Sequence, residues 1–184
     1  MVAAEGAAVV VLEPAEQARA RGAGVLALVS GGGSAGDAHN LAAPHPQGRG
    51  AELAMRRALA DAAVQPSAVD ALVAHATATP LGDVAEVRAV KAVFGASPRL
   101  AVTAPKGAIG HGLGAAGAFA VVVAALSLRD GVLAPTRNLS DPDPECQLDH
   151  VVDRPRRAAL GKVLVNASGF GGQNAAVLLS RDQP

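Results

Sequence analysis

The sequence predicts an α/β layered domain, because three observations agree. Short valine-rich apolar runs alternate along the chain with stretches that carry helix signals. Near the C-terminus two apolar runs, 163–166 and 175–179, flank a Gly-rich turn of the kind that closes a β-hairpin. Half of the 184 residues are apolar, which is enough to build a buried core between layers.

The first quarter of the chain predicts two strands and a short helix. Ala7–Leu12 is a continuous apolar run, typical of a buried strand. Pro14 stands near the first turn of a helix that extends to Arg21. Val25–Val29 predicts the second strand, and the glycines at 31–33 that follow indicate bulges or close backbone approach.

A loop, a helix and a strand follow. Asp37–Gly50 has prolines, glycines and little periodicity, so we expect a surface loop. Glu52–Ala63 predicts a helix whose inner side carries Leu53, Met55 and Leu59. After a turn at Pro66, Val69–Ala74 predicts a strand that ends at His75.

The remaining elements include one unusually apolar helix. Thr79-Pro80 predicts a helix start, and that helix reaches about Phe94; Leu100–Thr103 predicts a strand. Gly112–Leu128 carries no charge, but it is short for a bilayer and rich in Gly and Ala, so we expect a core helix and no membrane span. Because no side of it is charged, this helix should be covered all round. Residues 131–144 predict an irregular crossing.

Charge and cysteine content exclude several classes of function. Sixteen basic and sixteen acidic residues cancel without a basic block, so nucleic acid is not an expected partner. The single cysteine, Cys146, permits no internal disulfide, which suits a reducing cytoplasm. Residues 1–11 contain Glu5 and lack a basic start, so we do not expect a signal peptide.

The first motif with chemical potential is His75-Ala76-Thr77-Ala78-Thr79-Pro80. Its histidine leaves the end of a predicted strand, where ligand sites of α/β sheets gather. In an extended segment both threonine hydroxyls would face one side and could bind an extended polar ligand. By itself the motif is better explained by a strand-end histidine and a threonine helix cap before Pro80.

The second motif is Lys106-Gly107-Ala108-Ile109-Gly110-His111, at the expected start of the apolar helix. A helix N-terminus disfavours imidazolium, and a neutral imidazole can donate a hydrogen bond to a developing oxyanion. The third is Gly169-Phe170-Gly171-Gly172, whose backbone N–H groups could bind an oxyanion while the ring moves. The alternatives are a Gly-rich helix start and an ordinary hairpin.

Together the three motifs resemble the signature of β-ketoacyl-ACP synthases, the ketosynthases of fatty acid and polyketide synthesis. The family patterns are His-Gly-Thr-x-Thr-Pro, Lys-Ser-x-x-Gly-His and Gly-Phe-Gly-Gly-x-Asn, and this chain matches their order and separations. The resemblance runs from Glu5-Gly6 to Leu179 and covers the second half of such an enzyme, so we expect residues 1–184 to form the C-terminal domain.

The resemblance implies a thiolase-like fold, C-terminal half: a mixed sheet with helices on both faces and a terminal β-hairpin. It implies an acyltransferase whose nucleophilic cysteine lies in an N-terminal half, with acyl carrier protein as the partner and a dimer or hetero-oligomer as the assembly. No cofactor or metal is implied, since the substrates are carried on phosphopantetheine. Claisen condensation would follow decarboxylation of malonyl-carrier.

By the same resemblance, each motif residue has an expected role. His75 and His111 would stabilise the enolate oxygen, and Lys106 would hold a neighbouring network. Thr77 and Thr79 would bind the amides of the pantetheine arm. Phe170 would be a gate ring, with its N–H as an oxyanion donor.

Several positions depart from the family pattern, namely Ala76, Gly107, Ala120, Ser168 and Ala42, which replace Gly, Ser, Glu, Phe and Thr. Cys146 is not expected to be the nucleophile, since neighbouring carboxylates raise a thiol pKa. Three alternatives stay open: a chain-length-factor-like subunit, a malonyl-carrier decarboxylase and an inactive gene product. Chain-length factors usually lose the histidines, which this chain keeps.

Overall fold

Six strands form one sheet in the order β1-β8-β7-β2-β3-β5 in the computed structural model of the chain, which describes residues 1–95 and 100–182. The strands are β1 (Leu28–Gly36), β2 (Ala71–Val73), β3 (Ala101–Thr103), β5 (Asp149–His150), β7 (Lys162–Gly169) and β8 (Gln173–Ser180). β2 runs parallel to β7 and β3, and β3 runs parallel to β5. β8 is antiparallel to both β7 and β1. The predictions of a mixed sheet and a terminal hairpin are therefore confirmed.

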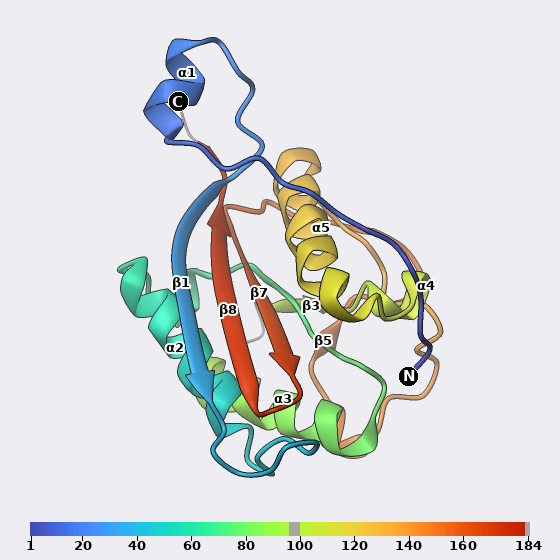
Figure 1. Cartoon of the computed structure of the whole chain (residues 1–184). Helices are drawn as coiled ribbons and strands as arrows, with labels where there is room; N and C mark the ends of the chain where they lie inside the picture. The colour runs from blue at the N-terminus through green and yellow to red at the C-terminus, as the bar shows by residue number, and fades with distance from the viewer. Residues whose placement is uncertain (96–99, 183–184) are drawn as a thin grey trace.

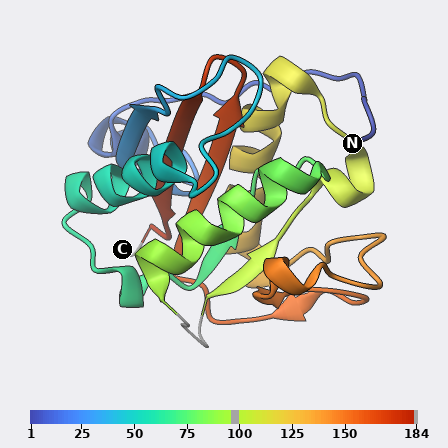
Figure 2. The ribbon, with the colours of Figure 1, turned by 90° about the horizontal axis from the view of Figure 1, so that it is seen from below.

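Helices cover both faces of this sheet (Figure 1). α2 (Arg49–Asp61) and α3 (Pro80–Phe94) lie over one face, as Figure 2 shows, and α5 (Ala116–Asp130) lies over the other. The shorter helices are α1 (Ala15–Ala20), η1 (Pro66–Ala68), α4 (Lys106–Ile109), η2 (Leu113–Ala115) and η3 (Pro144–Cys146). Two short strands, β4 (Val132–Leu133) and β6 (Arg156–Arg157), pair antiparallel near α5.

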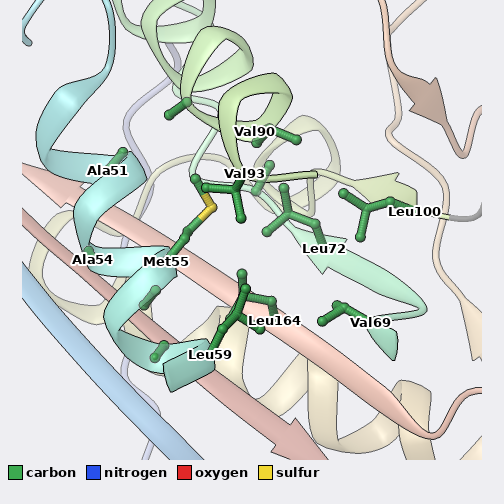
Figure 3. Close-up of a cluster of buried hydrophobic side chains, with 14 of the residues drawn as sticks. Ala51, Ala54, Met55, Leu59, Val69, Leu72, Val90, Val93, Leu100 and Leu164 are labelled. Atoms are coloured by element: carbon green, nitrogen blue, oxygen red, sulfur yellow. The ribbon is translucent and has the colours of Figure 1, made fainter. Parts of the chain in front are cut away.

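The central strands β2, β3 and most of β7 are buried on both faces, because alternate side chains enter two separate cores, whereas the edge strand β1 exposes alternate residues. In β2, Leu72 joins the core under α2 and α3, whereas Ala71 and Val73 join the core under α5. Figure 3 shows the first core, where the Met55 side chain of α2 extends towards Val93 of α3. This two-sided burial explains why the strands read as continuous apolar runs.

Glycines in β1 allow α2 to lie very close to the sheet. A Cβ at Gly31 would stand 2.5 Å from the carbonyl oxygen of Ala58, and one at Gly33 would stand 2.2 Å from that of Ala54. The predicted close approach is therefore confirmed, and the register shifts between Val29 and Gly31 as a bulge would require. The strand begins three residues later than predicted and continues through the glycines.

The prediction of a buried strand at Ala7–Leu12 is wrong. This segment is extended but unpaired and exposed, with Val9 at 88% and Val11 at 84% exposure. Within the described residues no strand lies beside it to pair with its backbone groups. Its β-branched composition alone is not enough to form a strand. A single parallel bridge joins Ala3 to His111 instead.

Two helix predictions also need correction. α2 begins at Arg49, and Leu53 is 38% exposed while the inner side carries Ala51, Ala54, Met55, Ala58 and Leu59. The apolar helix begins only at Ala116, after the 3-10 turn η2. Small residues at this start allow either form, so sequence patterns do not fix the boundary.

The apolar helix packs on the sheet by one side only. Ala116, Ala120, Ala124, Ser127 and Leu128 are buried, but only 28% of the residues in Leu113–Asp130 are. Within the described chain the other side of this helix is uncovered, so the cover expected all round it is left to an association partner. By length and composition alone this stretch is also apolar enough to cross a membrane.

Candidate active site

The predicted histidines and lysine meet at the carboxyl ends of β2 and β3. His75 follows β2, Lys106 begins α4 after β3, and His111 follows α4. The imidazole rings of His75 and His111 pack edge to face, with centroids 5.5 Å apart. The Lys106 Nζ lies 3.5 Å from the Nδ1 of His75. Three groups separated by up to 36 positions in sequence thus form one cluster.

Both imidazoles are held neutral. Burial, with the charges of Lys106 and then His111, lowers the pKa of His75 to about 3. Burial and the Lys106 charge also lower the pKa of His111. A neutral imidazole keeps one N–H donor and one acceptor, so the remaining question is which nitrogen carries the proton.

Local contacts decide the tautomer of both rings. The His111 Nδ1 accepts the backbone N–H of Leu113 at 3.1 Å, which leaves the proton on Nε2. The Lys106 ammonium beside the Nδ1 of His75 favours a lone pair there, which again leaves the proton on Nε2. Each histidine therefore presents an Nε2–H donor, as oxyanion stabilisation requires.

Lys106 lies between these rings and the carboxylates of α3. Burial lowers the pKa of its ammonium, while Glu86 and Asp83 act in the opposite direction. Ala120 is 2% exposed in the apolar core under α5. The nearby negative charge thus comes from α3 rather than from α5, where the family pattern has its glutamate.

Thr77 and Thr79 present their hydroxyls on one side of their segment, with the two Oγ1 atoms 3.0 Å apart. Neither caps α3: Thr79 occupies the N-cap position without a side-chain hydrogen bond. Ala76 and Ala78 adopt positive φ angles of 35° and 57°. For a residue with a Cβ this left-handed backbone is strained, so the segment stays in place only because its surroundings hold it.

Glu86 is the residue that holds this segment, and sequence analysis missed its role. Its Oε1 accepts the backbone N–H of His75 and its Oε2 that of Ala76, both at 2.7 Å. The Nδ2 of Asn166 also donates to Oε1 at 2.7 Å. A sequence signal was present, since Glu86 shares the inner side of α3 with Val90 and Val93, and buried carboxylates require partners.

Phe170 lies apart from the cluster. It stands at the tip of the β7–β8 hairpin with its side chain 77% exposed, and it does not line the cavity described below. The hairpin is tied to the predicted surface loop: Gly171 donates its N–H to Leu41, and Asp37 donates its own to Gly172. Asp37 in turn accepts from Asn174 Nδ2 at 3.0 Å, so loop and hairpin form one unit.

Two departures from the family pattern have local explanations. A Cβ at Gly107 would stand 2.4 Å from the carbonyl oxygen of Arg137, so the crossing segment leaves no room for serine. Asn138 Nδ2 donates to the Gly107 carbonyl at 2.9 Å, which fixes this approach. The hydroxyl of Ser168 donates to Asn174 Oδ1 at 2.7 Å across the hairpin.

Cys146 is not arranged as a nucleophile. Burial raises the pKa of its thiol, and Asp143, Asp83 and Glu145 raise it further. A raised pKa leaves little thiolate at neutral pH, and the acidic neighbours act in the predicted direction as well as burial. No group of three or more His, Cys, Asp or Glu side chains is placed to hold a metal ion in residues 1–95 and 100–182.

A cavity of about 460 Å³, a size typical of small-molecule sites, is lined by most of these groups but not by His75. Lys106, His111, Thr77 and Thr79 line its polar end. It then continues beneath α3 between the sheet and the crossing segment. The cluster therefore opens onto a space that can admit a substrate.

Comparisons with known proteins agree with this geometry. A family model described as beta-ketoacyl synthase, C-terminal domain, matches residues 26–140. The chain is 42% identical over 181 residues to 3-oxoacyl-[acyl-carrier-protein] synthase 2 of Staphylococcus aureus (strain COL), and equally so to that of Coxiella burnetii (strain RSA 493 / Nine Mile phase I). Each alignment covers 98% of this chain and 44% of the relative.

Solved structures give the same result. The ishigamide ketosynthase/chain length factor superposes with a TM-score of 0.93 at 37% identity, over 98% of this chain and 44% of that one. A β-ketoacyl synthase from Burkholderia phymatum STM815 superposes with a TM-score of 0.86 at 33% identity, over 93% and 41%. The chain thus spans less than half the length of the proteins it matches.

Proposed function

Because the chain belongs to the β-ketoacyl synthase family, with the thiolase-like fold of its C-terminal half, we propose that residues 1–184 form the decarboxylating domain of a condensing enzyme. The observation that carries the proposal is the His75–Lys106–His111 cluster with two neutral rings and two Nε2–H donors. The substrate class is a malonyl thioester on the phosphopantetheine of acyl carrier protein, without a further cofactor.

In the proposed mechanism Thr77 and Thr79 bind the pantetheine amides and place the malonyl thioester beside the two rings. The bond between the α-carbon and the carboxylate breaks, and its electron pair forms the enolate as carbon dioxide leaves. The two Nε2–H groups donate to the enolate oxygen, in a site where burial strengthens such bonds. Lys106 keeps the proton of His75 on Nε2.

The fate of the enolate distinguishes two candidate functions. With an N-terminal half that carries an acylated cysteine, the α-carbon attacks the acyl carbonyl and expels the thiolate, with the Phe170 N–H as one oxyanion donor. Without that half, the α-carbon takes a proton from solvent and the reaction ends as a decarboxylation. The second candidate is favoured by a specific observation: the cluster is assembled by this chain's own residues.

We also propose that the chain works as a dimer or hetero-oligomer in the cytoplasm. The outer side of η2 and α5 is not buried, with Leu113 of η2 at 61% and Leu126 of α5 at 37% exposure. The apolar segment Ala7–Leu12 also runs exposed along the molecule (Figure 1). Exposed apolar surface of this kind marks an association site. An N-terminal ketosynthase half or a homologous subunit would cover both.

One experiment tests the function. The chain is mixed with malonyl-carrier, and separately with acyl-carrier and a candidate N-terminal half, and the products are followed by mass spectrometry. Loss of carbon dioxide that His111→Ala abolishes and His39→Ala preserves supports decarboxylation, since His39 is an exposed histidine of the Asp37 loop. A ketoacyl product supports condensation. If His111→Ala releases carbon dioxide as fast as the unchanged chain, both candidate functions are contradicted.

Sedimentation measures the association. The chain alone, or with the candidate half, should form a complex that buries the outer side of α5. Protection of α5 amides from hydrogen exchange in that complex identifies the surface. A monomer at every concentration, with or without the candidate half, contradicts the assembly.

A further inference from the structure

Among the described residues, the six-stranded sheet has β1 at one edge and β5 at the other (Figure 1). β5 has only two residues, whereas β1 has nine. A long free edge invites strand addition, because its unpaired N–H and C=O groups can bond another chain. Edge strands usually avoid this with lysine, proline or a bulge. β1 contains no charged residue and no proline, and its register shift lies near its start, between Val29 and Gly31.

Two side chains of α2 bond the backbone of this edge. The Oδ2 of Asp61 accepts the N–H of Gly32 at 2.9 Å. The guanidinium of Arg57 donates to the carbonyl of Ser34. Because the Gly32 N–H bonds Asp61, it points away from β8, and the backbone groups of Ser34, two residues on, point to the same side. Both bonds therefore lie on the side where an added strand would pair.

The spacing of the two side chains matches the spacing of the strand. Arg57 and Asp61 are four residues apart, so they lie on one side of α2, about 6 Å apart along its axis. Gly32 and Ser34 are two residues apart, which is about 6.6 Å along a strand. Gly33 lies between them, and a Cβ there would stand 2.7 Å from the Cβ of Arg57, so the helix is close enough for both bonds.

An added strand would need the space that these side chains occupy. Neighbouring strands lie about 4.8 Å apart, and a carbonyl oxygen of one lies about 2.9 Å from an amide nitrogen of the other. The Asp61 oxygen is already at this distance from the Gly32 nitrogen. The Arg57 guanidinium in the same way takes the place of an N–H group opposite Ser34. A carboxylate on an N–H and a guanidinium on a carbonyl are charge-assisted bonds, which a neutral strand does not readily displace.

We propose that Arg57 and Asp61 close the β1 edge against strand addition by a second copy of this chain. A second copy fits the edge because two β1 strands, antiparallel across a two-fold axis, would place no charged residue of one strand against the other. Gly-rich strands are also the ones whose pairing is weakly specified, and β1 contains Gly31-Gly32-Gly33. The inference goes beyond the proposed function and does not depend on it.

The test is the double variant Arg57→Ala, Asp61→Ala of the full chain, followed by sedimentation velocity over a range of concentrations. Self-association should become tighter by on the order of tenfold or more, since the freed backbone groups can bond a second β1. Hydrogen exchange should show new protection of the Ser34 amide in the associated form. The matched control is Glu52→Ala, Arg56→Ala, which removes the same two charges from α2 but from side chains that bond each other. It should associate like the unchanged chain.

A conservative variant separates the hydrogen bond from the charge. Asp61→Asn keeps an oxygen that can accept the Gly32 N–H, so it should sediment like the unchanged chain. Circular dichroism verifies that each variant is folded. The proposal is overturned if the double alanine variant associates no more tightly than the unchanged chain, or if it associates without protection of Ser34. Protection of α5 amides reports the separate association of the proposed function, so each inference can fail without the other.

Discussion

Glu86 holds His75 by its backbone rather than by its ring. The Glu86 carboxylate accepts the N–H groups of His75 and Ala76 and the Nδ2 of Asn166, each at 2.7 Å. The carboxylate thus joins α3, β7 and the loop after β2 at one point. This leaves the imidazole of His75 free to act and makes its position depend on a residue outside the reacting cluster.

Replacing Glu86 by Gln should therefore cost about 1 to 3 kcal/mol in the free energy of unfolding. The amide group cannot accept all three hydrogen bonds, and its own N–H₂ would face another donor. Urea denaturation measures the loss. Glu52→Gln is the control, because Glu52 forms only an exposed pair with Arg56 and should change stability by less than about 0.5 kcal/mol. Equal effects in both variants would contradict the role of Glu86.

Ala76→Gly should stabilise the fold by roughly 1 kcal/mol. Ala76 has a φ of 35°, a region that costs a residue with a Cβ but not glycine. Ala60→Gly is the control and should have the opposite effect on stability. Ala60 is exposed within α2, so glycine there should lower the free energy of unfolding by about 1 kcal/mol. Thermal unfolding of both variants tests the pair, and a drop in Tm for Ala76→Gly would rule out strain at this position.

Gly107→Ser, which restores the family residue, should destabilise this chain by about 1 to 3 kcal/mol, as overpacking usually does. The new Cβ would stand 2.4 Å from the Arg137 carbonyl, which is itself held by the neighbouring Asn138 bond to Gly107. Gly114→Ser is the control, because nothing lies within 4 Å of its Cβ position. If Gly107→Ser leaves the free energy of unfolding unchanged, the crossing segment moves aside at little cost and this prediction is wrong.

Stability should fall as the pH decreases from about 6.5 towards 5, and His75 should cause part of that slope. Its pKa is about 3 in the folded chain and about 6.5 in an unfolded one, so between these values only the unfolded chain binds the proton. Each pH unit in that window then costs about 1.4 kcal/mol. Urea denaturation at pH 7, 6 and 5 should show a shallower slope for His75→Asn. Parallel slopes would mean that the His75 ring is not buried beside Lys106.

Much of this architecture was predictable from the sequence. The helix Pro80–Phe94 has a proline at its start and a glycine at its end, so its bounds agree with the prediction. The glycines of β1 predicted a close backbone approach, which α2 makes. The sequence Gly169-Phe170-Gly171-Gly172 predicted the hairpin. These features depend on a few neighbouring residues, so they can be predicted without knowing what the rest of the chain packs against.

The failures depend on distant partners. Ala7–Leu12 has the composition of a strand, but a strand forms only beside another, and among the described residues none is adjacent. Leu53 fits a helix pattern, yet the tight contact of α2 with Gly31 and Gly33 brings alanines to the inner side. The site residues His75, Lys106 and His111 were identified as motifs, whereas the role of Glu86 required its three donors to be seen together.

The short bridge between Ala3 and His111 has a consequence for how the sequence can change. His111 donates its N–H to the Val2 carbonyl at 2.8 Å, and its own carbonyl accepts the N–H of Ala4 at 3.0 Å. Both bonds join main-chain atoms. Substitutions of the exposed side chains at Val2 and Ala3 therefore leave the bonds intact, and the position of His111 is retained. Proline at Ala4 is the exception, because it removes the donor.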